Sequence, residues 1–161
     1  MNNQPVPPPA NEAVEATVDK DLWVWGDDAT KPRLLHSMIR VRDLDKSLKF
    51  YCQGLGMAPI SRFDSEQGRF SLLFLSFTDF ASGPAIELTY NWDQPEDYSH
   101  GTGFGHIAIG VPDIQGMCDH LAAHGGTVTT APKKMVAGAP HLAFVKDPDG
   151  YSIELIQTFH G

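Results

Sequence analysis

The chain contains an internal repeat, and this repeat limits the folds open to it more than any other feature. The segment starting at His36 reads HSMIRVRD and the segment starting at His106 reads HIAIGVPD, with His, Ile, Val and Asp at matching places. Ile-Glu-Leu also recurs, around Glu87 and around Glu154. The histidine precedes the glutamate by 51 residues in the first half (87 − 36) and by 48 in the second (154 − 106). The repeat therefore indicates two structural units of the same design.

The hydrophobic pattern predicts the element order βαβββ in each half. In the first half we expect a helix after the first strand, because Leu44, Leu48, Tyr51 and Leu55 recur at helical spacing. Asp43 is placed to cap this helix, and in the second half Pro112-Asp113 is expected to open the helix. The predicted strands cover 34–41, 57–63, 70–77 and 85–90, and then 104–111, 127–130, 142–146 and 151–158. The predicted fold class is α+β, with two tandem βαβββ modules.

A β-hairpin near the end of the chain is the clearest local signal. The apolar runs LAFV and YSIELI flank Asp147-Pro148-Asp149-Gly150, in which proline presets a turn and Gly150 can adopt a positive φ. The second strand of this hairpin carries Glu154 between two aliphatic residues. An acid in such a strand requires either solvent or a ligand.

Composition shifts divide the chain into a leader at 1–32, a first module at 33–92, a linker at 93–103 and a second module at 104–161. The leader is proline-rich at its start and is expected to be partly disordered, although Trp23 and Trp25 suggest a docking segment. No secretory signal, transit peptide or membrane-length apolar run is present, and two cysteines without C-x-x-C spacing favour free thiols. A cytoplasmic protein is expected.

The formal net charge of −8 argues against nucleic acid and anionic membranes as partners, because both require a basic surface. Small molecules and protein partners are favoured instead. Cys118 falls on the apolar stripe of the second helix and is expected in the core. His120 and His124 lie four residues apart on that helix, but no repeated acid accompanies them, so a solvated helix surface is the better interpretation.

The repeated residues predict a metal site. One strand glutamate alone is most often solvent-facing, but chance does not explain the same His and the same Glu at matched places in both halves. If a pseudo-twofold axis relates the modules, His36, Glu87, His106 and Glu154 can converge on one point. Two imidazoles and two carboxylates suit a borderline divalent ion such as Zn²⁺, Ni²⁺ or Co²⁺.

Strand alternation adds a second feature to this site. Arg40 shares a strand face with His36, about 13 Å farther along at roughly 3.3 Å per residue, and Asn91 stands in the same relation to Glu87. A surface ion pair for Arg40 and a turn cap for Asn91 are the alternatives. With the metal site in place, the layout fits an elongated anionic substrate with one end at the metal.

At these residues the sequence resembles the glyoxalase I family of the vicinal-oxygen-chelate superfamily. The matching motifs are LLHSMIRVRDLDKSLKFY, IELTYNW, GFGHIAIGVPD and LAFVKDPDGYSIEL, which cover nearly all of the chain after its leader. The resemblance implies that His36, Glu87, His106 and Glu154 ligate the metal with water completing the shell. It also implies a homodimer in which each site takes His36 and Glu87 from one subunit and His106 and Glu154 from the other.

The resemblance further implies isomerisation of the methylglyoxal–glutathione hemithioacetal to S-D-lactoylglutathione, with glutathione as cosubstrate. Glu154 would move the proton from C1 to C2, and Glu87 would be the second catalytic carboxylate. Arg40 and Asn91 match positions that hold the glutamyl end of glutathione, and Lys133 or Lys134 would meet the glycyl carboxylate. The metal would stabilise the enediolate as a Lewis acid.

The short spacings resemble the subclass activated by nickel or cobalt, so nickel is favoured, with zinc the alternative. Other functions within the superfamily are an epimerase, an extradiol dioxygenase and a non-catalytic drug-binding module. A dioxygenase would require two histidines and one carboxylate with an open face, which the second glutamate opposes. A drug-binding module would lack the four ligands.

Overall fold

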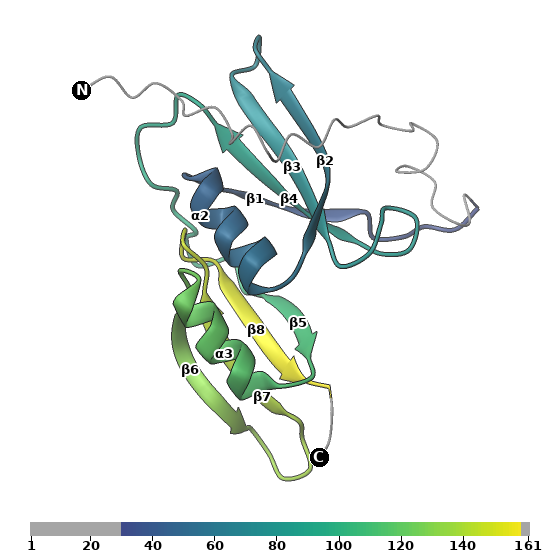
Figure 1. Ribbon diagram of the computed structural model, residues 1–161, viewed down its shortest axis with the longest axis vertical. Coiled ribbons are helices and arrows are strands. Elements are labelled where there is room, and N and C mark those ends of the chain that lie inside the picture. The colour runs from purple at the N-terminus through teal and green to yellow at the C-terminus, as the bar shows by residue number, and fades with distance from the viewer. Residues whose placement is uncertain (1–29, 159–161) are drawn as a thin grey trace. The chain divides into compact units, whose positions relative to one another are not determined.

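The computed structural model describes residues 30–158, which form two four-stranded sheets and three helical segments (Figure 1). The strands are β1 (His36–Arg40), β2 (Ala58–Ser65), β3 (Phe70–Ser76), β4 (Ala85–Asn91), β5 (Ile107–Val111), β6 (Thr127–Lys134), β7 (His141–Lys146) and β8 (Ser152–Gln157). The helical segments are α2 (Leu44–Leu48), η1 (Lys49–Gly54) and α3 (Ile114–Ala123). Residues 1–29, which include Trp23 and Trp25 of the predicted leader, lie outside the described range.

The two sheets have the same topology, which confirms the predicted pair of βαβββ modules. Their strand orders are β1-β4-β3-β2 and β5-β8-β7-β6. In each sheet the first strand of the module pairs parallel to the last, and the remaining neighbours are antiparallel. Each module therefore places its first strand, which follows or contains the repeated histidine, beside the strand that carries the repeated glutamate.

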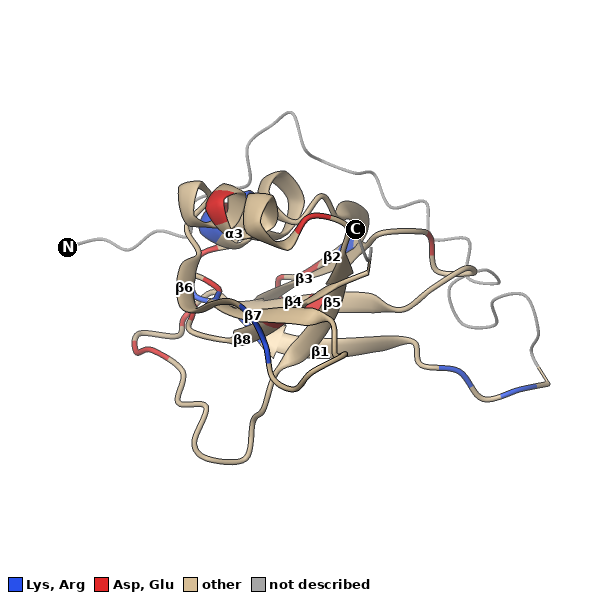
Figure 2. Ribbon diagram, turned by 90° about the horizontal axis from the view of Figure 1, so that it is seen from below, with Lys and Arg blue, Asp and Glu red and all other residues tan. Residues whose placement is uncertain are grey.

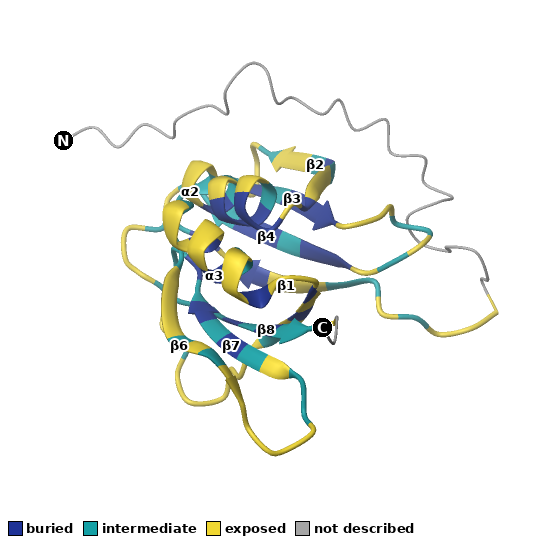
Figure 3. Ribbon diagram, turned by 60° about the horizontal axis from the view of Figure 1, so that its bottom comes forward, coloured by how far each residue is buried: buried dark blue, intermediate teal, exposed yellow. Residues whose placement is uncertain are grey.

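Each sheet has one densely packed face. In β8, Ile153 and Leu155 are fully buried while Glu154 between them is only half-buried, and in β4 the residues Ile86 and Leu88 flank Glu87 in the same way. Buried segments concentrate on β3 and β4, whereas the edge strand β6 is mostly exposed (Figure 3). The aliphatic neighbours of both glutamates therefore belong to the core, and the glutamates face away from it.

Helix α3 begins directly after Asp113, as the sequence predicts. The side chain of Asp113 caps it by accepting a hydrogen bond from the amide of Gly116 at 3.0 Å. Ile114, Cys118 and Leu121 form its buried face. Burial raises the pKa of the Cys118 thiol, with a smaller effect from the charge of Asp119, so Cys118 is a core residue and not an activated nucleophile.

The helix of the first half is less regular than the sequence pattern predicts. It starts as the α-helical α2 and continues as η1, a π-helix in which hydrogen bonds span one residue more than in an α-helix. Phe50 and Tyr51 on η1 are fully buried. Gly56, with a φ of 81°, then reverses the chain direction.

The described residues divide into two compact units that do not follow the sequence repeat. One unit contains residues up to Asp45 together with Gly56–Asp97, and the other contains Lys46–Leu55 together with Tyr98 onward. The first half of the sequence thus contributes its helical segment to the unit that holds the second sheet. The imidazole Nε2 of His120 on α3 lies 3.0 Å from the carbonyl oxygen of Gln53 on η1, which joins the two helices of this unit.

Asp147 fastens the same helical segment to the β7–β8 turn. Its carboxylate accepts hydrogen bonds from the amides of Asp149 (3.0 Å) and Tyr151 (2.8 Å), and from the Tyr51 hydroxyl (2.8 Å). Gly150 in this turn has the positive φ that the sequence predicts, 89°. Burial raises the pKa of Asp147, and the Tyr51 hydrogen bond opposes that rise. The turn that sets the register of β8, and so the position of Glu154, is thus held by three donors.

Charged residues are distributed over the described surface. Figure 2 shows short basic and acidic segments on strands, helices and loops. No helix within residues 30–158 is long and apolar enough to cross a membrane.

We expect Tyr51→Phe to lower the free energy of unfolding by about 1–3 kcal/mol, because it removes a donor from the buried Asp147 carboxylate. Urea denaturation followed by fluorescence measures this. Tyr90→Phe is the matched control, since it removes a half-exposed tyrosine hydroxyl from β4. Equal stability of the two variants would contradict a structural role for the Tyr51–Asp147 bond.

Candidate metal centre

The first module brings His36 and Glu87 into direct contact. The parallel register sets Met38 opposite Glu87, so His36 at the start of β1 lies diagonally across from the glutamate on the same sheet face. His36 Nε2 lies 3.0 Å from Glu87 Oε2. Their side chains are 30% and 12% exposed, so the pair is sheltered but still accessible from solvent. Thr89 donates a 3.1 Å hydrogen bond to the other oxygen, Oε1.

The second module repeats this arrangement with His106 and Glu154. The register sets Ala108 opposite Glu154, and His106 directly precedes β5. His106 Nε2 lies 3.0 Å from Glu154 Oε2, with side-chain exposures of 44% and 15%. The two predicted His–Glu pairs therefore form at the same separation through the same atoms.

An aromatic ring completes each pair. Phe74 stands opposite Glu87 in the sheet register and meets the ring of His36 edge-on, with centroids 5.4 Å apart. Phe144 stands opposite Glu154 and meets His106 in the same way at 5.5 Å. Edge-to-face packing of this kind restricts the imidazole orientation. The sequence analysis missed these two residues, although each precedes its Ile-Glu-Leu motif and recurs in both halves.

The four predicted ligands do not form one cluster. Within residues 30–158, no three or more His, Cys, Asp or Glu side chains gather as a metal site would require. Each module supplies one imidazole and one carboxylate. One pair provides two donors, so a metal site with four protein ligands requires two pairs.

The geometry of each pair fits a divalent cation. With metal–ligand bonds of about 2.1 Å, two neighbouring ligands of an octahedral ion are separated by about 3.0 Å, and those of a tetrahedral ion by about 3.4 Å. The observed Nε2–Oε2 separation is 3.0 Å in both pairs. An ion bound between the imidazole and the carboxylate would contact both through these atoms. In addition, His36 Nδ1 is buried and has no hydrogen-bond partner within the described range, while the edge of the ring packs against Phe74.

The predicted substrate-binding residues Arg40 and Asn91 lie on the same face of the first sheet as His36 and Glu87. Arg40 ends β1 opposite Thr89, and Asn91 ends β4 opposite Phe70. Both lie farther along their strands than the His36–Glu87 pair, as strand alternation predicts.

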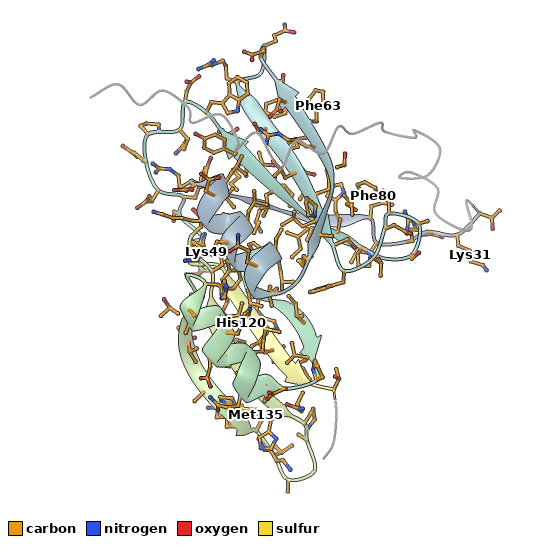
Figure 4. The ribbon with its side chains drawn as sticks, in the orientation of Figure 1. Lys31, Lys49, Phe63, Phe80, His120 and Met135 are labelled. Atoms are coloured by element: carbon orange, nitrogen blue, oxygen red, sulfur yellow. The ribbon has the colours of Figure 1, made fainter. Side chains whose placement is uncertain are left out.

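In each sheet, the face that carries the His–Glu pair is called the His–Glu face below. Phe63 on β2, 55% exposed, belongs to it because Phe63 pairs with Leu72 and Leu72 pairs with Thr89 (Figure 4).

The sheet register separates the two candidate lysines of the second module. Both fall on β6, which extends farther than the 127–130 expected. Lys133 pairs with Leu142, which pairs with Ile156, so Lys133 is on the His–Glu face of the second sheet. Lys134 pairs with His141 and falls on the opposite face. Of the two, Lys133 is placed toward Glu154.

Three further histidines, His100, His120 and His124, make contacts away from the His–Glu pairs. His124 Nδ1 lies 2.7 Å from the carbonyl oxygen of His120, and the two rings are 4.2 Å apart on α3 (Figure 4 labels His120). His100 stacks on Tyr151 at 4.1 Å. None of these three is recorded against a carboxylate. His160 lies outside the described residues.

Comparison with known proteins decides the family. Residues 33–155 match the sequence pattern of the Glyoxalase/Bleomycin resistance protein/Dioxygenase superfamily. The chain belongs to this superfamily. The match spans both sheets and all four residues of the two His–Glu pairs, so the resemblance seen in the sequence motifs is confirmed.

Within the superfamily, the chain is similar to proteins named lactoylglutathione lyase or glyoxalase I. A Vibrio cholerae protein named "Probable lactoylglutathione lyase" is 51% identical over 126 residues, which cover 78% of this chain and 91% of the relative. The lactoylglutathione lyase of Haemophilus influenzae is 46% identical over 78% of this chain and 93% of its own length. The crystal structure of glyoxalase I from Zea mays superimposes with a TM-score of 0.74 at 38% identity and covers 80% of this chain. This chain spans 45% of the maize chain.

We expect His36→Gln and His106→Gln each to weaken Co²⁺ binding to the metal-free protein by more than about 100-fold, because each removes one nitrogen donor. Isothermal titration calorimetry measures the affinity. His120→Gln and His124→Gln are matched controls, since both histidines are on α3 and neither is recorded against a carboxylate. Unchanged affinity in His36→Gln or His106→Gln would rule out that imidazole as a ligand.

Proposed function

We propose that this chain is a lactoylglutathione lyase, which isomerises the hemithioacetal of methylglyoxal and glutathione to S-D-lactoylglutathione. The observation that carries this proposal is the repeated His–Glu pair, with 3.0 Å separations, in a chain about half identical to lactoylglutathione lyases. Its role is then methylglyoxal detoxification. The compact fold provides one such pair on each of its two modules, residues 33–92 and 104–161.

The working unit is a homodimer. Each pair supplies two donors, and a site of four ligands forms when His36 and Glu87 of one subunit meet His106 and Glu154 of the other. The isologous contact of a twofold dimer would create two such sites. The resemblance to glyoxalase I supports this arrangement, and so does the presence of one His–Glu pair in each module.

A divalent ion bound by these four residues supplies Lewis-acid stabilisation of the negative charge that develops on the substrate oxygens. Nickel is favoured, with zinc and cobalt as alternatives. The short spacings between the repeated ligands in the sequence, 51 residues from His36 to Glu87 and 48 from His106 to Glu154, support this preference by their resemblance to the nickel- or cobalt-activated subclass. Glutathione is the cosubstrate, and its glutamyl end is bound by Arg40 and Asn91, while Lys133 binds the glycyl carboxylate.

Glu154 acts as the catalytic base. It takes the proton from C1 of the hemithioacetal and returns it to C2, so that no net oxidation or reduction occurs. Ile153 and Leu155 anchor its strand in the core, while its side chain remains 15% exposed and reachable by the substrate. Glu87 is the second carboxylate and serves the opposite stereoisomer. Cys52 and Cys118 form no disulfide with each other, which supports a reducing, cytoplasmic location.

We expect the protein treated with a chelator to form no thioester from methylglyoxal and glutathione, and to recover activity when Ni²⁺ or Co²⁺ is added. Thioester absorbance follows the reaction directly. Adding Fe²⁺ with a catechol tests for extradiol oxygenation in the same preparation. Thioester formation that is indifferent to chelation, or absent with every metal, would contradict the proposed function. A drug-binding protein would show neither reaction.

We expect Glu154→Gln to lower kcat by about 10²- to 10⁴-fold, because the amide cannot accept the C1 proton. Glu87→Gln is the matched control, since it makes the same change in the other His–Glu pair, and we expect it to retain more turnover. Size-exclusion chromatography should show an unchanged dimer in both variants. A Glu154→Gln enzyme with near-normal kcat would remove Glu154 from the role of base.

A further inference from the structure

Lys146 lies on the same sheet face as Glu154, two residues away in the strand register. β7 and β8 are antiparallel, with Phe144 opposite Glu154 and Lys146 opposite Ser152. Residues directly opposite each other in neighbouring strands project to the same face, as do residues two apart in one strand. Lys146 is therefore displaced by two residues, roughly 6.7 Å, from the level of Glu154.

The burial of the residues in β7 shows, independently of the strand register, which side of the strand faces the core. Ala143 and Val145 are 0% exposed and form part of the core. Phe144 is on the other face, where its ring contacts His106. Lys146 is two residues from Phe144 and is half-exposed, so its side chain starts from the His–Glu face and has access to solvent.

The first module has no cation at this position. Phe74 corresponds to Phe144 because each faces the glutamate of its own module, and Ser76 therefore corresponds to Lys146. Ser76 is 1% exposed and donates a 3.0 Å hydrogen bond to the carbonyl of Pro84. The lysine thus breaks the symmetry of the repeat on the face where the proposed chemistry takes place. The metal site itself does not require it, since the first module forms the same His–Glu pair without it.

Lys146 and Lys133 flank Glu154 from opposite directions along the sheet. Lys133 is level with Leu142 and Ile156, two residues beyond Glu154, whereas Lys146 is level with Ser152, two residues before it. If the glutathione part of the substrate extends toward Lys133 while the reacting carbon lies at Glu154, the group that derives from the aldehyde extends toward Lys146.

We propose that Lys146 extends the substrate range of this enzyme beyond methylglyoxal to 2-oxoaldehydes that carry an anionic substituent, such as a carboxylate or a phosphate, and favours these over neutral aldehydes of the same shape. The proposal rests on the proposed function and specifies its substrate class. An ammonium group can form a charge-assisted hydrogen bond to such a substituent. The methyl group of methylglyoxal makes no such bond, so its turnover is independent of Lys146.

The test compares two aldehydes of similar shape, phenylglyoxal and 4-carboxyphenylglyoxal, each as its glutathione hemithioacetal with the metal-loaded full-length enzyme. The measured quantity is the ratio of kcat/KM for the carboxylated over the neutral substrate. We expect Lys146→Gln to lower this ratio about tenfold through loss of a bond to a charged group, mainly in KM. Lys146→Arg should retain it. Lys134→Gln, which removes the same charge from the opposite face, should leave the ratio unchanged.

The outcomes separate this proposal from the function on which it rests. If wild-type enzyme turns over methylglyoxal and Lys146→Gln leaves the ratio unchanged, the selectivity proposal is wrong and the lyase function stands. An equal loss for the neutral and the carboxylated substrate would also overturn it, because Lys146 would then serve the general reaction or the fold. If wild-type enzyme forms no thioester from methylglyoxal with any metal, the lyase function fails and the selectivity proposal fails with it.

Discussion

The parallel pairing between the first and last strand of each module is the constraint on which the rest of the structure depends. β1 pairs with β4 and β5 with β8, although the paired residues are 49 positions apart in the first module (His36 and Ala85) and 46 apart in the second (Ile107 and Ile153). A parallel partner cannot be reached by a tight turn, so the intervening chain must cross over and then add its remaining strands on the far side of the last one. The order β1-β4-β3-β2 follows directly. It is this pairing that brings a histidine from one end of the module to a glutamate near the other end.

The core then keeps those two side chains at a fixed separation. Aliphatic residues on both sides of each glutamate are buried, so the strand cannot rotate its carboxylate toward the packed face without exposing them. The aromatic rings of Phe74 and Phe144 brace the imidazoles from a third strand. At the β7–β8 turn, three hydrogen bonds to Asp147 prevent a slip in register. The site is precise because rigid elements support it and not because its own residues bind each other strongly.

The sequence predicted the features that repeat and missed those that depend on long-range packing. The His–Glu pairs, the positive φ of Gly150 and the Asp113 cap each have a local or duplicated signature, and all three are present. The π-helical turn in η1 has no such signature, since it accommodates packing of Phe50 and Tyr51 against residues far along the chain. Strand alternation places Thr89 on the same face as Glu87, but only the structure shows that its hydroxyl donates to the carboxylate. For the same reason the choice between Lys133 and Lys134 required strand pairing across a bulged β6.

The placement of Lys46–Leu55 bears on how a chain like this could have arisen from a duplicated ancestor. A protein made by joining two self-sufficient copies should come apart at the linker into two autonomous halves. Here a cut in the linker would take η1 away from α3 and from the β7–β8 turn, leaving the cavity that Phe50 and Tyr51 now fill. At Gly126 an added Cβ would lie 2.9 Å from Phe50, so the lack of a side chain there leaves room for that ring. A segment that belongs to the first copy of the repeat by sequence thus packs in the unit of the second copy, so the repeated unit of the sequence and the compact unit of the structure have different boundaries.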